Sequence, residues 1–138
     1  MEDLKETITK IETAMAQAFN RRDVDAILQH FDENVVGFSS TKHERLWGLE
    51  AMRKTFAYFI DPSEKVVFQP DEIEVREYGQ VVIATFYWVA TVYSGKQQRE
   101  VHGRGSHVFV NRNGQWKIVN EHFSRAHHPP ELWDSSPG

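Results

Sequence analysis

The sequence predicts an α+β fold in which the helices come first and a long antiparallel sheet follows. Apolar residues recur at helical spacing up to residue 60, and from residue 65 the apolar pattern alternates with a period of two. The links between the later runs are short enough for hairpins. Helices followed by consecutive strands are typical of α+β domains. We expect a curved sheet that wraps three N-terminal helices and leaves one end of the interior open.

Three amphipathic helices are expected in the first sixty residues. Asp23 is a suitable N-cap for a short second helix, and the third runs from Leu49 to Ile60, where Asp61-Pro62 ends it. A short strand, Val35 to Ser39, is expected between the second and third helices. The buried stripe of the first helix consists of Leu4, Ile8, Ile11, Met15 and Phe19.

Four long strands are expected in the second half. Pro70 lies inside the first of them, which predicts an edge strand or a bulge there. The second is apolar on both faces, as suits a central strand. The four runs are Lys65 to Tyr78, Val81 to Tyr93, Arg99 to Val110 and Gln115 to Ser124.

Length and composition indicate one ordinary globular domain. The 138 residues fit a single domain, which we place at residues 1–126 with a C-terminal tail at 127–138. The net charge of −4 argues against nucleic acid or an anionic membrane as a partner. The absence of cysteine excludes disulfides and thiolate metal sites. The N-terminus lacks the pattern of a signal peptide, so a cytoplasmic location is expected.

The register of the last hairpin decides which side chains face inward. We interpret Arg112-Asn113-Gly114 as a three-residue loop with Gly114 in the left-handed conformation. A loop of two or four residues would instead set His107 and Phe109 on the face of Trp116. The three-residue loop pairs Val110 with Trp116, Val108 with Ile118, Ser106 with Asn120 and Arg104 with His122.

On this register Arg104 and His122 lie on the inner face. A buried guanidinium needs a carboxylate, a bound anion or water. Glu72 or Glu74 could pair with Arg104, or Arg104 and His122 could flank the polar end of a cavity and hold a carboxylate; both interpretations stay open. The candidate ligand-binding residues are Arg104, His102, Ser106, Asn120, His122, Trp47, Tyr87 and Tyr58.

Two of these residues are also catalytic candidates. His122 could act as a general acid or base, and Tyr87 could offer a hydroxyl group to a ligand. A strand histidine that is hydrogen-bonded in a core is nevertheless commoner than a catalytic one. His43 and His102 with His122 match no compact metal-binding motif, so no metal and no cofactor are expected. Aromatic residues that could line the apolar part of a cavity, or form plain core, are Trp47, Phe56, Tyr58, Phe86, Tyr87 and Trp88.

The opposite face of the sheet predicts a subunit interface. Apolar side chains mixed with charges on an outward face favour a homodimer, the commonest way to cover such a surface. The residues assigned to this face are Val101, Phe109, Val119 and Phe123, with Lys117 and Glu121 among them.

Several segments together resemble the NTF2-like superfamily, in particular its SnoaL-like branch with the calcium/calmodulin-dependent kinase II association domains. They are Trp47-Gly48, the run from Arg104 to Val110, the run from Asn113 to Val119, and His122-Phe123-Ser124. The resemblance implies a cone-shaped α+β barrel, also called cystatin-like, with a deep cavity and dimerisation through the sheet. It also implies a range of activities that includes isomerases, cyclases, dehydratases and epoxide hydrolases.

The catalytic residues of these enzymes are only partly matched. In the isomerase-like members a general-base aspartate follows the first short strand, and here Phe38 lies near that place. The Asp-Arg-Asp set of the epoxide hydrolases is absent. We therefore favour a homodimer that binds a small polar or carboxylate-bearing organic molecule in its cavity. The alternatives are an isomerase, cyclase or dehydratase that uses His122, and an association module.

Overall fold

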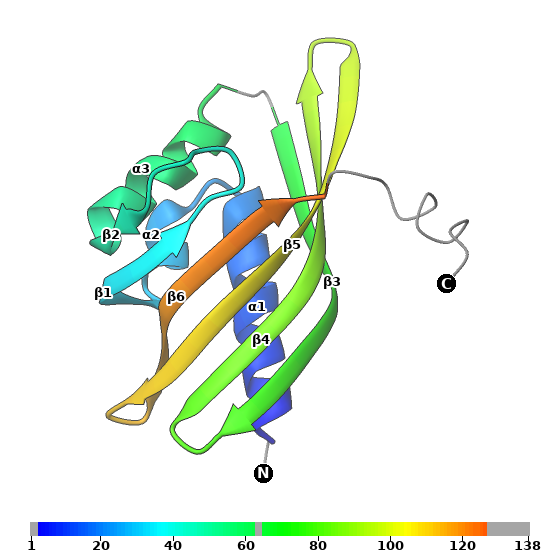
Figure 1. Ribbon diagram of the computed structural model, residues 1–138. Helices are drawn as coiled ribbons and strands as arrows, with labels where there is room; N and C mark the ends of the chain where they lie inside the picture. Colours follow the sequence, from blue (N-terminus) through cyan, green and yellow to red (C-terminus); the bar gives the residue numbers. More distant parts are fainter. Residues whose placement is uncertain (1–2, 63–64, 127–138) are drawn as a thin grey trace.

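Three helices pack against one face of a six-stranded sheet, which curves around them without closing (Figure 1). The computed structural model describes residues 3–62 and 65–126, so the expected tail at 127–138 lies outside the described residues. The strand order is β2-β1-β6-β5-β4-β3. The elements are α1 (Leu4–Asn20), α2 (Val24–Leu28), β1 (Phe31–Phe38), β2 (Leu46–Trp47), α3 (Gly48–Ile60), β3 (Lys65–Tyr78), β4 (Val81–Ser94), β5 (Gln97–Arg112) and β6 (Gln115–Arg125).

The α+β prediction is confirmed, with differences at the start of the sheet. The expected second helix ends at Leu28, and β1 already begins at Phe31. A two-residue strand, β2, which was not among the expected elements, precedes α3. β1 runs parallel to β6, whereas the other strand pairs are antiparallel. Among the described helices, none has the length and apolar character to cross a membrane.

The first helix is fixed at both ends. The side chain of Asp3 accepts a hydrogen bond from the backbone N–H of Glu6 at 2.7 Å, which satisfies one of the free donors of the first turn. At the other end, the side chain of Asn20 accepts from the backbone N–H of Phe68 and donates to its carbonyl oxygen, at 2.7 and 3.0 Å. These two bonds attach the end of α1 to β3. The predicted N-cap of α2 is also confirmed, since Asp23 accepts from the backbone N–H of Ala26.

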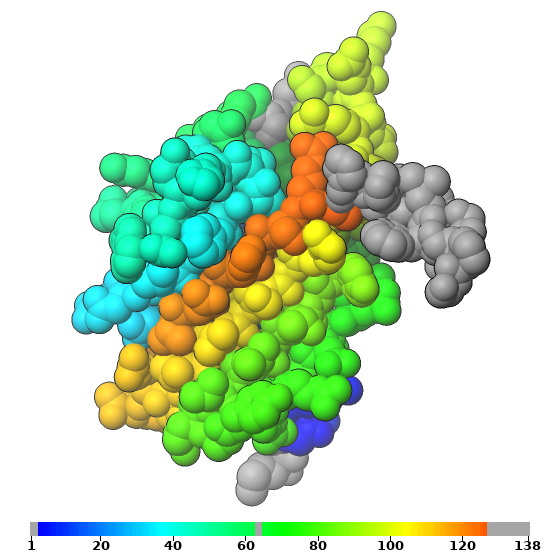
Figure 2. Space-filling model, viewed as in Figure 1, coloured from blue at the N-terminus to red at the C-terminus, as the bar shows by residue number. Residues whose placement is uncertain are grey.

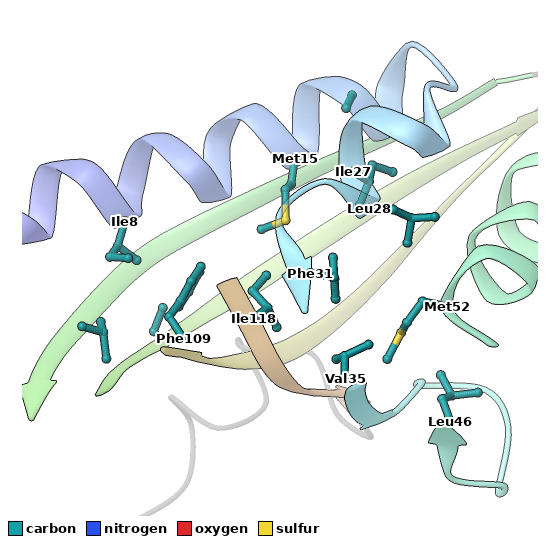
Figure 3. Close-up of a cluster of buried hydrophobic side chains, with 13 residues drawn as sticks. Ile8, Met15, Ile27, Leu28, Phe31, Val35, Leu46, Met52, Phe109 and Ile118 are labelled. Carbon is teal, nitrogen blue, oxygen red and sulfur yellow. The ribbon is translucent and has the colours of Figure 1, made fainter. Parts of the chain in front are cut away.

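The apolar core lies between the helices and the sheet and extends from Ile8 and Phe109 to Leu46 and Met52 (Figure 3). Ile8 and Met15 extend from α1 toward Phe109 and Ile118 on the sheet (Figure 3). Ile8, Phe109 and Ile118 have no exposed surface. Side chains with complete burial each contribute about 1.5–3 kcal/mol to folding, so this cluster holds the helix layer on the sheet.

The predicted register of the β5–β6 hairpin is wrong by one residue. The loop contains two residues, Asn113 and Gly114, with φ of 55° and 86°. Positive φ at both positions is the signature of the type I′ turn, which Asn-Gly favours and which matches the twist of the strands. Arg112 therefore pairs with Gln115, and Phe109 pairs with Ile118. Because strand side chains alternate, this shift turns His107 and Phe109 inward and Arg104 and Ser106 outward.

A bulge in β6 then changes which of its residues face inward. Phe109 pairs with Ile118, but Val108 pairs with Asn120, so Val119 is an extra residue on β6. Beyond the bulge Glu121 and Phe123 point inward, and His122 points outward. The predicted outer-face set is corrected accordingly: Phe109 and Glu121 are buried on the inner face, and Val101 and Phe123 also lie on this face.

The expectations for the first and second long runs agree better with the structure. β3 is an edge strand, and its pairing with β4 is irregular between Asp71 and Glu74, directly after Pro70. Proline lacks the N–H that a ladder requires, so it lies where a strand needs no partner on one side. β4 lies between β3 and β5 and buries Val82, Ala84, Phe86 and Trp88.

Replacing Phe109 by alanine should destabilise the protein by about 3–5 kcal/mol, because the side chain is fully buried between α1 and the sheet. Chemical denaturation measures this free energy of unfolding. Tyr78→Ala is the control, since Tyr78 is 63% exposed and its loss should change the stability by less than about 0.5 kcal/mol. A small effect of Phe109→Ala would contradict the inward register of β5.

Candidate functional site

The open end of the interior contains a cavity of about 200 Å³. It lies between α1, α3 and the inner face of β3, β4, β5 and β6, and its wall is mainly apolar. The aromatic residues of the wall, apart from His107, are Phe19, Phe31, Phe56, Phe59, Phe68, Phe86, Trp88 and Phe123. A concave apolar cavity with few polar groups is the usual form of a small-molecule site.

The inner face of the sheet is arranged in rows across β4, β5 and β6. The deepest row, Val82–Phe109–Ile118, belongs to the core. The next three rows are Ala84–His107–Glu121, Phe86–Gly105–Phe123 and Trp88–Gly103–Arg125. Because a strand rises about 3.3–3.4 Å per residue, neighbouring rows are about 7 Å apart. Polarity therefore varies along the cavity: charged groups at its inner row, rings in the middle, and an arginine farther out.

Two glycines of β5 make space for the aromatic rings. A Cβ atom at Gly103 would lie 2.1 Å from Cζ2 of Trp88, and one at Gly105 would lie 2.6 Å from Cε2 of Phe86. Each ring thus lies flat over the backbone of the neighbouring strand. A side chain at either glycine would force these buried rings to move, so glycine is required for the shape of the wall.

The inner row contains a buried charged cluster formed by Glu12, His107 and Glu121. Nδ1 of His107 lies 2.7 Å from Oε2 of Glu12 on α1, and Nε2 lies 2.7 Å from Oε1 of Glu121 on β6. All three side chains are less than a tenth exposed. Both ring nitrogens face carboxylate oxygens, and a nitrogen must carry a proton to bond with a carboxylate, so His107 is doubly protonated.

The electrostatics of the cluster favour the imidazolium form. Burial alone would lower the pKa of His107, but the charges and hydrogen bonds of Glu12 and Glu121 outweigh it and raise the pKa to about 10. Four aromatic rings surround the imidazole, with centroids 5.4–6.0 Å away, and keep water from it. One imidazolium between two carboxylates leaves one net negative charge at the inner end of the cavity.

Four of the predicted site residues do come together, but on the outer face of the sheet. Tyr87, Arg104, Ser106 and His122 line an open groove of about 520 Å³, which Glu72 and Glu74 also line. The view of Figure 2 looks onto this face, with α1 behind the sheet. The predicted inward position of Arg104 and His122 is therefore wrong, for the two reasons of turn length and bulge given above.

The other predicted site residues are dispersed. Trp47 and Tyr58 are 65% and 54% exposed and do not line the cavity. His102 lies 3.2 Å from Glu100, and the amide group of Asn120 donates to the carbonyl oxygen of Val36 at 3.0 Å. Of the aromatic residues expected at the cavity, Phe56, Phe86 and Trp88 do line it.

The sequence interpretation missed the charged cluster, although one signal was present. Glu12 follows Ile8 by four residues and precedes Met15 by three, so it lies within the apolar stripe of α1. A carboxylate on a buried stripe requires a partner. The partner could not be named, because the register that brings His107 and Glu121 to the inner face depends on the turn and the bulge.

His107 should remain protonated through neutral pH. In an NMR titration its ring should lose a proton near pH 10, whereas His30, whose pKa burial and nearby Lys117 lower, should titrate below pH 6.5. The pKa of His107 is higher in the folded protein than the unfolded value of 6.5. Its contribution to the free energy of unfolding is therefore complete below pH 6.5 and is lost as the pH rises toward 10. The free energy of unfolding should fall by about 2–3 kcal/mol from pH 7 to pH 9. Deprotonation of His107 near pH 6.5 would contradict the cluster.

Comparisons with solved structures agree with this architecture. An NTF2-like superfamily protein from Salmonella enterica serovar Typhimurium matches with 20% identity and a TM-score of 0.79, over 90% of this chain and 92% of that one. A proposed calcium/calmodulin-dependent protein kinase II association domain from Xanthomonas campestris matches with 15% identity and a TM-score of 0.82, over 93% of this chain and 91% of that one. A proposed ketosteroid isomerase from Parabacteroides distasonis matches with 21% identity and a TM-score of 0.70, over 91% of this chain and 90% of that one. At these identities the likeness shows the fold alone.

The sequence comparison is more specific. No curated protein matches the chain. The family model of the SnoaL-like domain matches residues 8–128, which include most of α1, the sheet and all three members of the charged cluster. The chain therefore belongs to the SnoaL-like domain family, and its fold is that of NTF2-like proteins.

Proposed function

We propose that this protein binds a small, mainly apolar organic molecule in the cavity between its helices and its sheet. The observation that carries the proposal is the cavity itself: about 200 Å³ of space with an aromatic wall, next to a closed and well-packed core. The apolar wall of the cavity is not covered by other side chains, so an apolar guest that covers it would bind with a favourable free energy. The proposed guest lies inside this cavity and contacts its apolar wall. It does not lie at Arg104, where the sequence interpretation placed the ligand.

Binding is a better account of the site than acid catalysis by His107. With a pKa of about 10, transfer of its proton at pH 7 would cost about 4 kcal/mol before any chemistry begins. A general acid works best when its pKa lies near the working pH. His122 and Tyr87, the catalytic candidates from the sequence, lie in the outer groove and do not line the cavity. The cluster instead supports the proposal by fixing one wall of the cavity in place.

The neutral compound 4-phenylbutan-1-ol should bind to the protein, and Ala90→Leu should weaken its binding about tenfold or more. Ala90 lines the cavity, so a larger side chain there occupies the space of the guest. Isothermal titration calorimetry measures both affinities. Thr91→Leu is the control. Thr91 follows Ala90 on β4, so its side chain lies on the opposite face of the sheet, and a larger side chain there should not change the affinity. Equal affinity of the Ala90→Leu variant would refute binding in this cavity.

We also propose that two copies of the chain associate through the outer face of the sheet. The residues that support this differ from those expected: Val81 pairs with Val110, and Ile83 pairs with Val108, all with partly exposed apolar side chains on the outer face. No described helix covers this face (Figure 1). An uncovered apolar patch is the usual basis of a two-fold interface. The cytoplasmic location and the ligand-binding roles of Arg104 and its neighbours stay predictions.

Light scattering with size-exclusion chromatography should give twice the 16.1 kDa mass of the chain. Ile83→Lys should shift the mass to that of a single chain, because it introduces a charge into the apolar patch. Gln17→Lys on the exposed side of α1 adds the same charge elsewhere and should leave the dimer intact. A wild-type protein with the mass of one chain at micromolar concentration would overturn the dimer.

A further inference from the structure

The indole nitrogen of Trp88 is a buried donor without an acceptor. Trp88 is 4% exposed and lines the cavity. Within residues 3–62 and 65–126, its Nε1 is the one buried side-chain nitrogen or oxygen that lacks a hydrogen-bond partner. Buried polar groups are nearly always satisfied in native proteins. Since an indole nitrogen can only donate, the missing partner must supply an acceptor oxygen or nitrogen.

The position of the indole places this donor beside the outer row of the cavity. Cε2 and Cζ2 of Trp88 lie 2.2 and 2.1 Å from the point that a Cβ of Gly103 would occupy, so the ring covers this glycine. Nε1 is bonded to Cε2 and therefore lies at the same place. Gly103 pairs with Trp88 on one side and with Arg125 on the other. The ring thus extends across β5 toward the strand that carries Arg125.

Arg125 supplies a positive charge to the same row. Its side chain is exposed at the rim and lines the cavity. No ion pair of Arg125 is found within the part of the chain that the structure describes. A guanidinium keeps its proton in proteins, and its planar fork matches the geometry of a carboxylate.

We propose that Trp88 and Arg125 bind the carboxylate of an organic acid whose apolar body extends inward along the cavity. This rests on the proposed function, because it names the class of guest that the cavity takes. One carboxylate oxygen accepts from Nε1 of Trp88, and the guanidinium of Arg125 neutralises the charge. The apolar body then lies against Phe86 and Phe123, the next row inward.

The charged cluster fixes the orientation of the guest. His107 follows Gly103 by four residues on β5, which corresponds to about 13 Å along the strand. The cluster of Glu12, His107 and Glu121 carries one net negative charge there and repels a carboxylate from the inner end. An organic acid therefore enters with its apolar end first and keeps its carboxylate at the rim.

The test compares 4-phenylbutyrate with 4-phenylbutan-1-ol, which has the same apolar body and no charge. By calorimetry the acid should bind to the wild type about tenfold or more tightly than the alcohol. Arg125→Gln should remove this preference and leave the alcohol unaffected. The indole N–H signal of Trp88 is identified by its absence from the NMR spectrum of Trp88→Phe. In the wild type this signal should shift downfield when the acid binds. Trp88→Phe should also weaken the binding of the acid several-fold.

Arg99→Gln is the matched control. Arg99 also lines the cavity, but on β5 it lies four residues farther out than Gly103, the partner of Arg125. It removes the same charge and should keep the preference for the acid. Equal binding of acid and alcohol to the wild type would overturn the carboxylate site while leaving cavity binding in place. An equal loss in Arg99→Gln and Arg125→Gln would overturn the assignment to Arg125. Failure of both compounds to bind would overturn this proposal and the proposed function together.

Discussion

The register of the β5–β6 hairpin decides which chemical groups the interior contains. Side chains alternate along a strand, so each change of one residue in turn length or strand pairing exchanges the two faces. The two-residue turn at Asn113 and Gly114 turns His107 inward, and the extra residue Val119 turns Glu121 inward beside it. With the turn alone, Asn120 and His122 would face His107 and Gly105. The charged cluster exists because both features occur on the same pair of strands.

The charged cluster is costly to bury and is nevertheless well supported. Taking ions out of water costs several kcal/mol for each, and this cost is offset only where geometry and hydrogen bonds are good. Here both ring nitrogens of His107 have an acceptor at 2.7 Å, and the acceptors come from α1 and β6. The cluster thereby joins the helix layer to the sheet between the apolar core and the cavity. Removal of His107 would leave two buried carboxylates without a positive partner, so the imidazolium has a structural role independent of any chemistry.

The shape of the cavity follows from where side chains are missing. Gly103 and Gly105 allow Trp88 and Phe86 to lie across β5, so that aromatic surface covers the backbone where aliphatic side chains would stand in an ordinary core. Flat rings on a curved sheet form a wall, and the helices α1 and α3 complete it. The outer face of the same strands carries Arg104 and His122 in an open groove. The two faces therefore present different environments, one enclosed and mainly apolar, the other polar and open.

The sequence by itself determined the elements and their order. The helical spacing of Ile8 and Met15, the N-cap at Asp23, the position of Pro70 on an edge strand and the resemblance to the NTF2-like superfamily all depend on local pattern, which one chain displays directly. The site was decided by tertiary structure. Glu12, His107 and Glu121 are far apart in sequence, and their meeting depends on a turn type and a bulge that alternation alone could not distinguish from a three-residue loop. A period of two is unchanged in form when a strand shifts by one residue, so the pattern predicted the two faces of β5 but assigned them to the wrong sides. On β6 the prediction was right as far as Ile118 and wrong beyond the bulge.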